Sequence, residues 1–104
     1  MMDTLKQIFG LVPSVDYAQL VKQGAIIIDV RSKMEFSHGH IKGSLNIPVD
    51  QLSKHLNQFP DKSKAIITCC ASGMRSASAK SILKSHGYIE VYNGGSWASL
   101  KNKI

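Results

Sequence analysis

The segment 64–80, KAIITCCASGMRSASAK, decides the fold that we expect for this chain. Its apolar run at 65–68 is rich in β-branched residues and predicts a strand that is buried on both faces. Residues 76–86 carry apolar side chains at helical spacing and are followed by a glycine, which predicts an amphipathic helix. The loop between this strand and this helix begins with Cys70 and ends with Arg75.

This loop favours a reactive cysteine. A loop that leaves a parallel strand and enters a helix points backbone N–H groups inward and adds the positive end of the helix dipole. Both features stabilise a thiolate, so Cys70 is a candidate nucleophile near neutral pH. Gly73 allows close approach of the backbone, and the guanidinium of Arg75 is suited to anions. The alternative is that Cys70 is a small buried hydrophobic residue, as free cysteines often are.

Apolar strands alternate with helical segments along the rest of the chain. We expect helices at 14–23, with Ser14 as the N-cap, and at 33–37, 49–59 and 96–101. Further strands are expected at 25–30, 45–47 and 89–92, with Gly94 and Gly95 forming a turn after the last one. This alternation predicts an α/β fold, a small parallel β-sheet flanked by helices on both faces, with right-handed crossovers.

Three blocks of sequence resemble one known family. The loop carries the pattern C-x-x-G-x-R-S at Cys70, Gly73, Arg75 and Ser76. Residues 26–48 contain IIIDVR, EF, GHI, GS and NIP in that order, and residues 92–97 read YNGGSW. Together they are similar to the active-site loop, the D-V-R to N-I-P region and the terminal glycine pair and aromatic residue of the rhodanese family of sulfurtransferases. The resemblance runs from about residue 14 to residue 100, nearly the whole chain.

The resemblance implies a sulfurtransferase. Cys70 would take a sulfane sulfur from thiosulfate, or from a persulfide on a protein or small thiol, and pass it to a thiophilic acceptor, which includes acceptor proteins. No metal or organic cofactor is expected. The implied substrate-binding residues are those of the loop: Ala71, Ser72, Gly73, Met74, Arg75 and Ser76. Arg75 would neutralise an anionic donor or orient the loop. The alternatives are a non-catalytic binding module on the same scaffold, and a small cysteine phosphatase or arsenate reductase.

The adjacent cysteines have different spacings to Arg75. Cys69 gives C-x5-R, the count of cysteine phosphatases, whereas Cys70 gives C-x4-R, the shorter loop of sulfurtransferases. The family's glycine and serine positions are in register only with Cys70, and no histidine directly precedes Cys69. Because neighbouring side chains of a strand point to opposite faces, Cys69 is expected to face away from the loop and to pack.

Two residues at the end of another strand, Asp29 and Arg31, are expected to support the loop. Asp29 would either anchor the backbone through hydrogen bonds or act as a general acid or base. We favour the anchor, because a carboxylate close to a thiolate would raise the pKa of the thiol. Arg31 and Glu35 are expected to form a structural ion pair. No histidine has partners at metal-ligand spacing, so no zinc site is expected.

Composition limits the class of protein. The chain has 104 residues, 43% hydrophobic and 19% charged, as expected for a single folded domain over 1–104, with 1–13 as an N-terminal arm or short element. Its formal charge of +6 comes from scattered basic residues, which suits small anions or acidic proteins better than nucleic acid. No apolar run approaches the roughly 20 residues that cross a membrane. The N-terminus does not resemble a signal peptide, and two adjacent cysteines make no disulfide framework, so a cytoplasmic protein is expected.

The loop departs from its family at two positions. Small single-domain relatives commonly carry a basic or polar residue directly after the nucleophile and a polar residue before the arginine. Here these positions hold Ala71 and Met74. A loop with fewer cations is expected to bind the thiosulfate dianion weakly and to accept a persulfide donor better.

Overall fold

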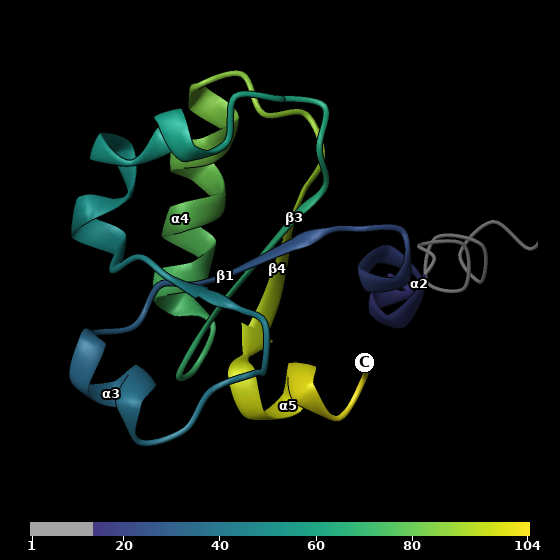
Figure 1. The fold of residues 1–104 in the computed structure, drawn as a ribbon, viewed down its shortest axis with the longest axis vertical. Helices are drawn as coiled ribbons and strands as arrows, with labels where there is room; N and C mark the ends of the chain where they lie inside the picture. The colour runs from purple at the N-terminus through teal and green to yellow at the C-terminus, as the bar shows by residue number, and fades with distance from the viewer. Residues whose placement is uncertain (1–13) are drawn as a thin grey trace, which may run out of the picture.

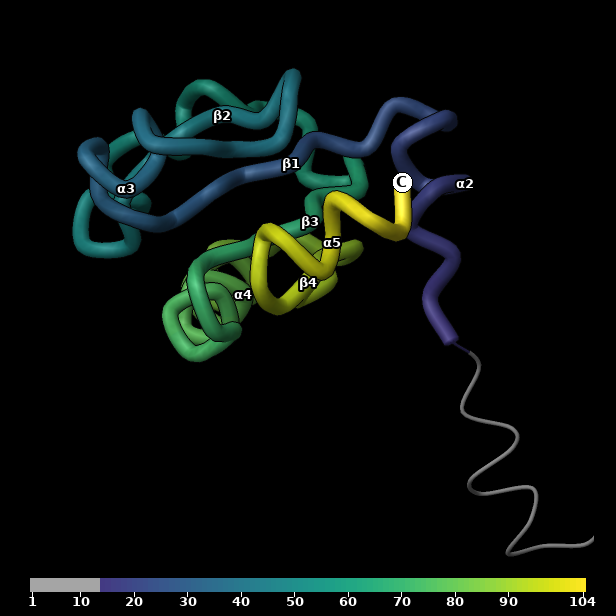
Figure 2. The backbone as a smooth tube through the Cα atoms, turned by 90° about the horizontal axis from the view of Figure 1, so that it is seen from below, coloured from purple at the N-terminus to yellow at the C-terminus, as the bar shows by residue number. Residues whose placement is uncertain are grey.

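The sheet has four parallel strands in the spatial order β2-β1-β3-β4. We describe residues 14–104 of a computed structural model, so the N-terminal arm or short element expected at 1–13 lies outside the described residues. The strands are β1 (Ile26–Asp29), β2 (Leu45–Asn46), β3 (Ile66–Cys70) and β4 (Val91–Ser96). Figure 2 shows them following one another across the sheet in this order.

Helices cover both faces of the sheet, as expected. They are α2 (Tyr17–Lys22), α3 (Lys33–Ser37), the 3₁₀ helices η1 (Val49–Lys54) and η2 (Leu56–Gln58), α4 (Met74–Ser85) and α5 (Trp97–Lys101). Figure 1 shows α4, η1 and η2 on one side of the strands, with α2 and α5 on the other. The predicted α/β fold is therefore confirmed.

Strand periodicity divides the core into two clusters. Ile28 and Ile66 point toward α4 and pack with Leu52, Leu83 and other apolar residues. Their neighbours in the chain point to the opposite face, where they pack with Leu100 and the half-buried apolar residues of α2. This arrangement follows from the two-residue period of a strand, which sends adjacent side chains to opposite faces.

The two strands that carry the predicted site residues are direct neighbours. β1 pairs with β3 in parallel, with Asp29 opposite Cys69. Because parallel strands end at the same edge of a sheet, the chain that follows Asp29 and the loop that follows Cys70 lie side by side.

Two of the expected helices differ in detail. The first begins at Tyr17, and its N-cap is Asp16 rather than Ser14, because the Asp16 carboxylate accepts the N–H of Gln19 at 3.0 Å. The segment 49–59 forms two 3₁₀ helices instead of one α-helix. His55, with φ of −117°, separates them, and the N–H groups of Gln51 and His55 donate three residues back.

The turn expected at Gly94 and Gly95 is wrong, because both residues belong to β4. Thr68 of β3 pairs with Asn93, whereas Cys70 pairs with Ser96, so β4 contains one extra residue and forms a bulge. A Cβ atom at Gly94 would lie 2.9 Å from side-chain atoms of the core, which leaves no room for a larger residue. The bulge redirects the end of β4 beside the cysteine loop.

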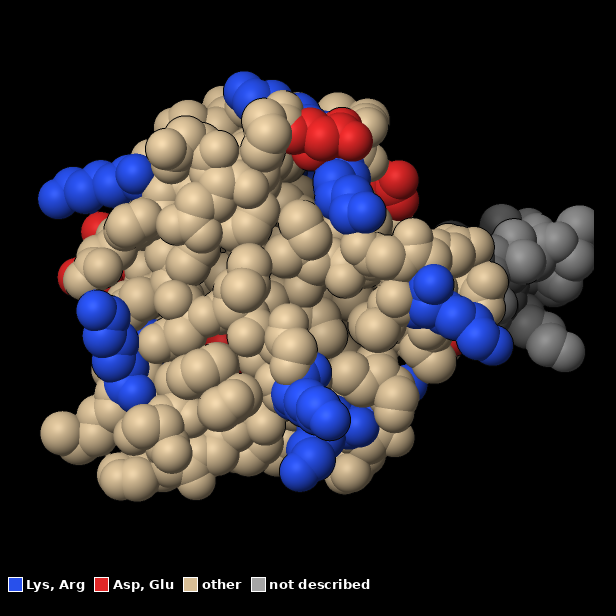
Figure 3. All heavy atoms as spheres, in the orientation of Figure 1, with Lys and Arg blue, Asp and Glu red and all other residues tan. Residues whose placement is uncertain are grey.

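Charge is spread over the surface. On the face seen in Figure 3, basic side chains stand around the outline with uncharged residues between them. Within residues 14–104, no helix is long and apolar enough to span a bilayer.

Candidate active site

The cysteine loop, which we define as residues 70–76, is shaped by one glycine. Gly73 is the N-cap of α4 and has φ of +104°, a left-handed conformation that other residues adopt only with strain. The chain therefore turns sharply from β3 into the first turn of α4. This turn directs backbone N–H groups toward the sulfur of Cys70.

The Cys70 sulfur lies inside this ring of donors. It accepts the N–H of Gly73 at 3.0 Å and the N–H of Ser76 at 3.4 Å, and the Ser76 hydroxyl is also 3.4 Å away. Burial raises the pKa of the Cys70 thiol, but hydrogen bonds from the Ser76 hydroxyl and from the N–H groups of Ser76, Gly73 and Ser72 outweigh it and hold the pKa below its ordinary value. Cys70 has 0% exposure, so its sulfur is enclosed by the residues around it.

Cys69 faces the other side of the sheet, as predicted. It is fully buried in the cluster that contains Ile27, Ile67 and Leu100. Burial and the nearby Asp29 carboxylate raise the pKa of its thiol to about 12, so it is protonated at neutral pH. The two adjacent thiols therefore have opposite electrostatic environments.

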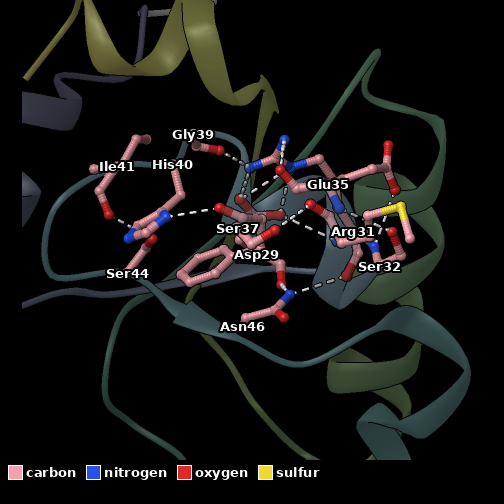
Figure 4. Close-up of polar contacts among 12 residues, drawn as sticks. Asp29, Arg31, Ser32, Glu35, Ser37, Gly39, His40, Ile41, Ser44 and Asn46 are labelled. Atoms are coloured by element: carbon pink, nitrogen blue, oxygen red, sulfur yellow. Dashed lines mark hydrogen bonds and ion pairs between the residues drawn. The ribbon is translucent and has the colours of Figure 1, made fainter.

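Asp29 anchors the loop that follows β1. Its carboxylate is fully buried and accepts the Nε of Arg31 at 2.9 Å, its Nη2 at 2.7 Å and its backbone N–H at 3.1 Å. Arg31 also donates to the carbonyl of Gly39 at 2.7 Å and stacks over the Trp97 ring, 4.7 Å from its centroid. Figure 4 shows Arg31 between Asp29 and Gly39. With its oxygens occupied in this way, Asp29 fits the predicted role of anchor.

The predicted ion pair between Arg31 and Glu35 is wrong, because Glu35 pairs with Arg75 instead. The Nη1 and Nη2 groups of Arg75 donate to the two Glu35 oxygens at 2.7 and 2.9 Å. Glu35 also closes a capping box with Ser32, which turns its side chain back over the start of α3. The guanidinium of Arg31 instead forms its ion pair with Asp29, two residues earlier in the chain. The pKa of Glu35 is lowered to about 2, mainly by the hydrogen bonds from Arg75 and to a smaller extent by the capping bonds from Ser32.

Two asparagines with no role predicted from the sequence hold the segments around the site. Asn46 donates through Nδ2 to the carbonyls of Asp29 and Arg31 at 3.1 and 2.9 Å. Asn93 accepts the Ser76 hydroxyl through Oδ1 at 2.6 Å. Asn46 is the last residue of β2 and stands two residues before Pro48, whereas Asn93 lies inside β4, directly before Gly94. A polar amide at the carboxyl end of a parallel strand is the signal that could have identified Asn46, whereas Asn93 carries no such signal.

The rim of the loop is mostly uncharged. Ala71 and Ser72 are exposed, and Met74 is 78% exposed. A second methionine, Met34 on α3, is 71% exposed and adjoins Glu35, the partner of Arg75. The one cation of the loop, Arg75, is engaged by a carboxylate, so the geometry favours its loop-orienting role over anion capture.

The sequence model of one protein family, the Rhodanese-like domain, matches residues 15–102 of this chain. The chain belongs to the rhodanese family. This rhodanese chain is 35% identical over 69 residues to thiosulfate sulfurtransferase PspE of Escherichia coli, a match that covers 65% of the chain and 66% of that protein. It is also 35% identical over 75 residues to the thiosulfate:glutathione sulfurtransferase of Saccharomyces cerevisiae, covering 61% of the chain and 54% of that protein.

Solved structures agree with this assignment. A rhodanese with anions from E. coli superposes with a TM-score of 0.70 at 31% identity, covering 73% of this chain and 91% of that one. The curated relatives above are named sulfurtransferases, but the matched region spans less than two thirds of each. The family also includes non-catalytic members, so the fold and family do not by themselves assign a reaction.

Proposed function

We propose that this rhodanese domain is a sulfurtransferase that carries a sulfane sulfur as a persulfide on Cys70. The observation that supports this most strongly is the environment of the Cys70 sulfur, which accepts the N–H groups of Gly73 and Ser76 at 3.0 and 3.4 Å. Such fixed donors stabilise a negative charge on sulfur, both in the attacking thiolate and in the persulfide that follows.

The reaction has two displacements. The Cys70 thiolate attacks the outer sulfur of a donor persulfide, a new S–S bond forms, the donor's S–S bond breaks, and the donor leaves as a thiolate. The acceptor thiolate then attacks the outer sulfur of the Cys70 persulfide, takes that sulfur and releases the Cys70 thiolate. With thiosulfate as donor, the leaving group of the first step is sulfite. Neither route needs an external oxidant, because the sulfane sulfur passes from one nucleophile, a thiolate or sulfite, to the next without a net change in oxidation state.

We infer that the preferred donor is a persulfide rather than thiosulfate. A dianion requires compensating charge, and each charge-assisted contact contributes on the order of 1.5–3 kcal/mol. The cation of the loop, Arg75, already donates to both oxygens of Glu35. The exposed side chains of Ala71 and Met74 add no charge, but Met74 offers apolar contact to a protein or thiol donor.

One observation favours a second candidate, a non-catalytic binding module. The Cys70 side chain is fully buried, and the exposed methionines Met34 and Met74 lie near the Glu35–Arg75 pair. A module that docks a partner through this surface needs no accessible thiol. The two candidates differ in whether sulfur is transferred.

The test is turnover with glutathione persulfide as donor and an excess of a small thiol as acceptor. We expect Cys70→Ser to abolish transfer and Cys69→Ala to retain most of it, because Cys69 lies on the opposite face of the sheet. Absence of turnover by the folded wild-type protein, with both persulfide and thiosulfate, would favour the binding module.

A further inference from the structure

One proton on Ser76 serves two acceptors. The Ser76 side chain is fully buried, and its oxygen lies 2.6 Å from Oδ1 of Asn93 and 3.4 Å from the sulfur of Cys70. A hydroxyl has a single proton to donate, so it cannot donate to the amide oxygen and to the sulfur at the same time. The protonation state of Cys70 decides which acceptor is the better one.

We propose that Asn93 is a positioning residue that holds the Ser76 proton while Cys70 is a thiol and releases it to the sulfur when Cys70 becomes an anion. In the thiol form, the S–H of Cys70 donates to the Ser76 oxygen, and the Ser76 hydroxyl donates to Asn93. In the thiolate form, the charged sulfur is the stronger acceptor, so the hydroxyl rotates toward it. No bond between heavy atoms changes in this step; the thiol proton leaves to solvent.

Asn93 can lose the hydrogen bond from the Ser76 hydroxyl at little cost in free energy. Its Oδ1 also accepts the N–H of Gly95 at 2.9 Å, so the oxygen keeps a donor when Ser76 turns away. Its Nδ2 donates to the Gly73 carbonyl at 3.2 Å, and its own carbonyl accepts the Tyr17 hydroxyl at 3.0 Å. The contacts with Gly95 and Gly73 fix the amide orientation, so that Oδ1 and not Nδ2 faces Ser76.

Charged groups around the loop do not drive this switch. Among residues 14–104, Asp29 and Arg31 are the charged groups that act on Cys69, and Arg75, which Glu35 engages, is the cation that interacts with the Cys70 anion. They form two ion pairs, Arg31 with Asp29 at 2.7 Å and Arg75 with Glu35 at 2.7 Å. Because these charges are paired, we expect the change in hydrogen bonding at the Cys70 sulfur to depend on the neutral donors, the Ser76 hydroxyl and the backbone N–H groups of the loop.

The test is the pH dependence of Cys70 alkylation by iodoacetamide, measured in a Cys69→Ala background. Asn93→Ala removes the acceptor that competes for the Ser76 proton, so we expect the Cys70 pKa to fall by about 0.5 to 1, the size of one modest hydrogen bond. Ser76→Ala should raise the pKa by a similar amount. In the Ser76→Ala background, Asn93→Ala should no longer lower the pKa. A merely structural role for Asn93 predicts the opposite sign, because a loosened loop would lose its N–H donors and raise the pKa.

Asn46→Ala is the matched control. Asn46 is a half-buried asparagine at the same sheet edge, but its amide contacts the β1 end and not Ser76, so the alkylation midpoint should stay unchanged. An unchanged or raised midpoint in Asn93→Ala, or a fall that persists without the Ser76 hydroxyl, would overturn the proposal. If Asn93→Ala does not fold, Asn93→Ser, whose shorter side chain removes the amide oxygen that accepts the Ser76 hydroxyl, takes its place: a lowered midpoint supports the switch, and an unchanged or raised one contradicts it. The proposal rests on the proposed function only in taking Cys70 as the nucleophile, and alkylation reports the switch whether or not sulfur is transferred.

Discussion

Glu35 and Arg75 lie 40 residues apart in the chain and are joined by two hydrogen bonds of 2.7 and 2.9 Å. The pair ties the first turn of α3 to the first turn of α4, directly beside the cysteine loop. It also neutralises the one cation that the loop motif supplies. Of the two roles expected for Arg75, neutralising an anionic donor or orienting the loop, these contacts match the second.

We expect the Glu35–Arg75 pair to stabilise the folded protein at neutral pH and to lose this effect in acid. Because Arg75 and the Ser32 cap depress the Glu35 pKa to about 2 in the folded state, the contribution is complete above the unfolded-state value of about 4.3 and is lost as the pH falls toward 2. The two side chains are 39% and 38% exposed, so solvent screening limits the contribution to about 1 kcal/mol or less.

Urea unfolding of Glu35→Gln and wild type at several pH values measures this contribution. The difference in the free energy of unfolding should be constant from pH 6 to 7 and shrink steadily below pH 4.5. Glu90→Gln is the control, since Glu90 is exposed and its carboxylate accepts the Tyr92 hydroxyl but contacts no basic side chain within residues 14–104. A difference for Glu35→Gln that does not vary with pH would show that the ion pair adds nothing to stability.

The two thiols should titrate far apart. Hydrogen bonds from the loop hold the Cys70 pKa below its ordinary value despite burial, whereas burial and Asp29 raise the Cys69 pKa to about 12. We expect the alkylation midpoint of Cys70 to lie below about 8.5, the value of a free thiol, and Cys69 to remain unmodified at neutral pH. Peptide mapping after alkylation at each pH assigns the sites. Faster modification of Cys69 than of Cys70 at pH 7 would contradict this order.

The loop should not support phosphatase chemistry. Four residues separate Cys70 from Arg75, so the ring of N–H groups is expected to hold one sulfur atom but to be too small for a tetrahedral phosphoryl group. We therefore expect no hydrolysis of aryl phosphates by the wild-type protein. Turnover that disappears in Cys70→Ser or in Cys69→Ala would refute the argument from loop length.

A cation added to the rim should improve the use of thiosulfate. Ala71 is exposed directly after Cys70, and Ala71→Arg would offer the dianion a charge that Arg75 does not supply. One charge-assisted contact corresponds to about a tenfold decrease in KM for thiosulfate. Transfer from glutathione persulfide should change little. Ala18→Arg, on the exposed surface of α2 at the other end of the sheet, is the matched control and should leave both activities unchanged. An efficient wild-type reaction at low thiosulfate concentration would contradict the inferred donor preference.

Helices and strands that depend on neighbouring residues in the chain were predicted correctly from the spacing of apolar residues. The isoleucine runs of β1 and β3 alternate between two faces, and Ser32 and Glu35 close a capping box at the expected position of α3. The position of Cys70 after a buried strand also follows from the sequence, because its motif and its strand lie in one segment.

Contacts between distant segments could not be predicted in this way. Spacing suggested Arg31 as the partner of Glu35, but the true partner, Arg75, becomes a neighbour only after the sheet forms. Glycines suggested a turn at Gly94, whereas pairing with β3 keeps the residue in a bulged strand. Asn93 is a third case, since its hydrogen bond to Ser76 joins two elements that the sequence does not relate.

Intact mass spectrometry tests most directly whether Cys70 carries the transferred sulfur. The protein is treated with glutathione persulfide, freed of excess donor, weighed intact, and then alkylated and mapped by peptide. We predict a gain of one sulfur atom, located on Cys70, absent in Cys70→Ser and retained in Cys69→Ala. A protein that gains no sulfur, or that gains it on Cys69, would contradict the account.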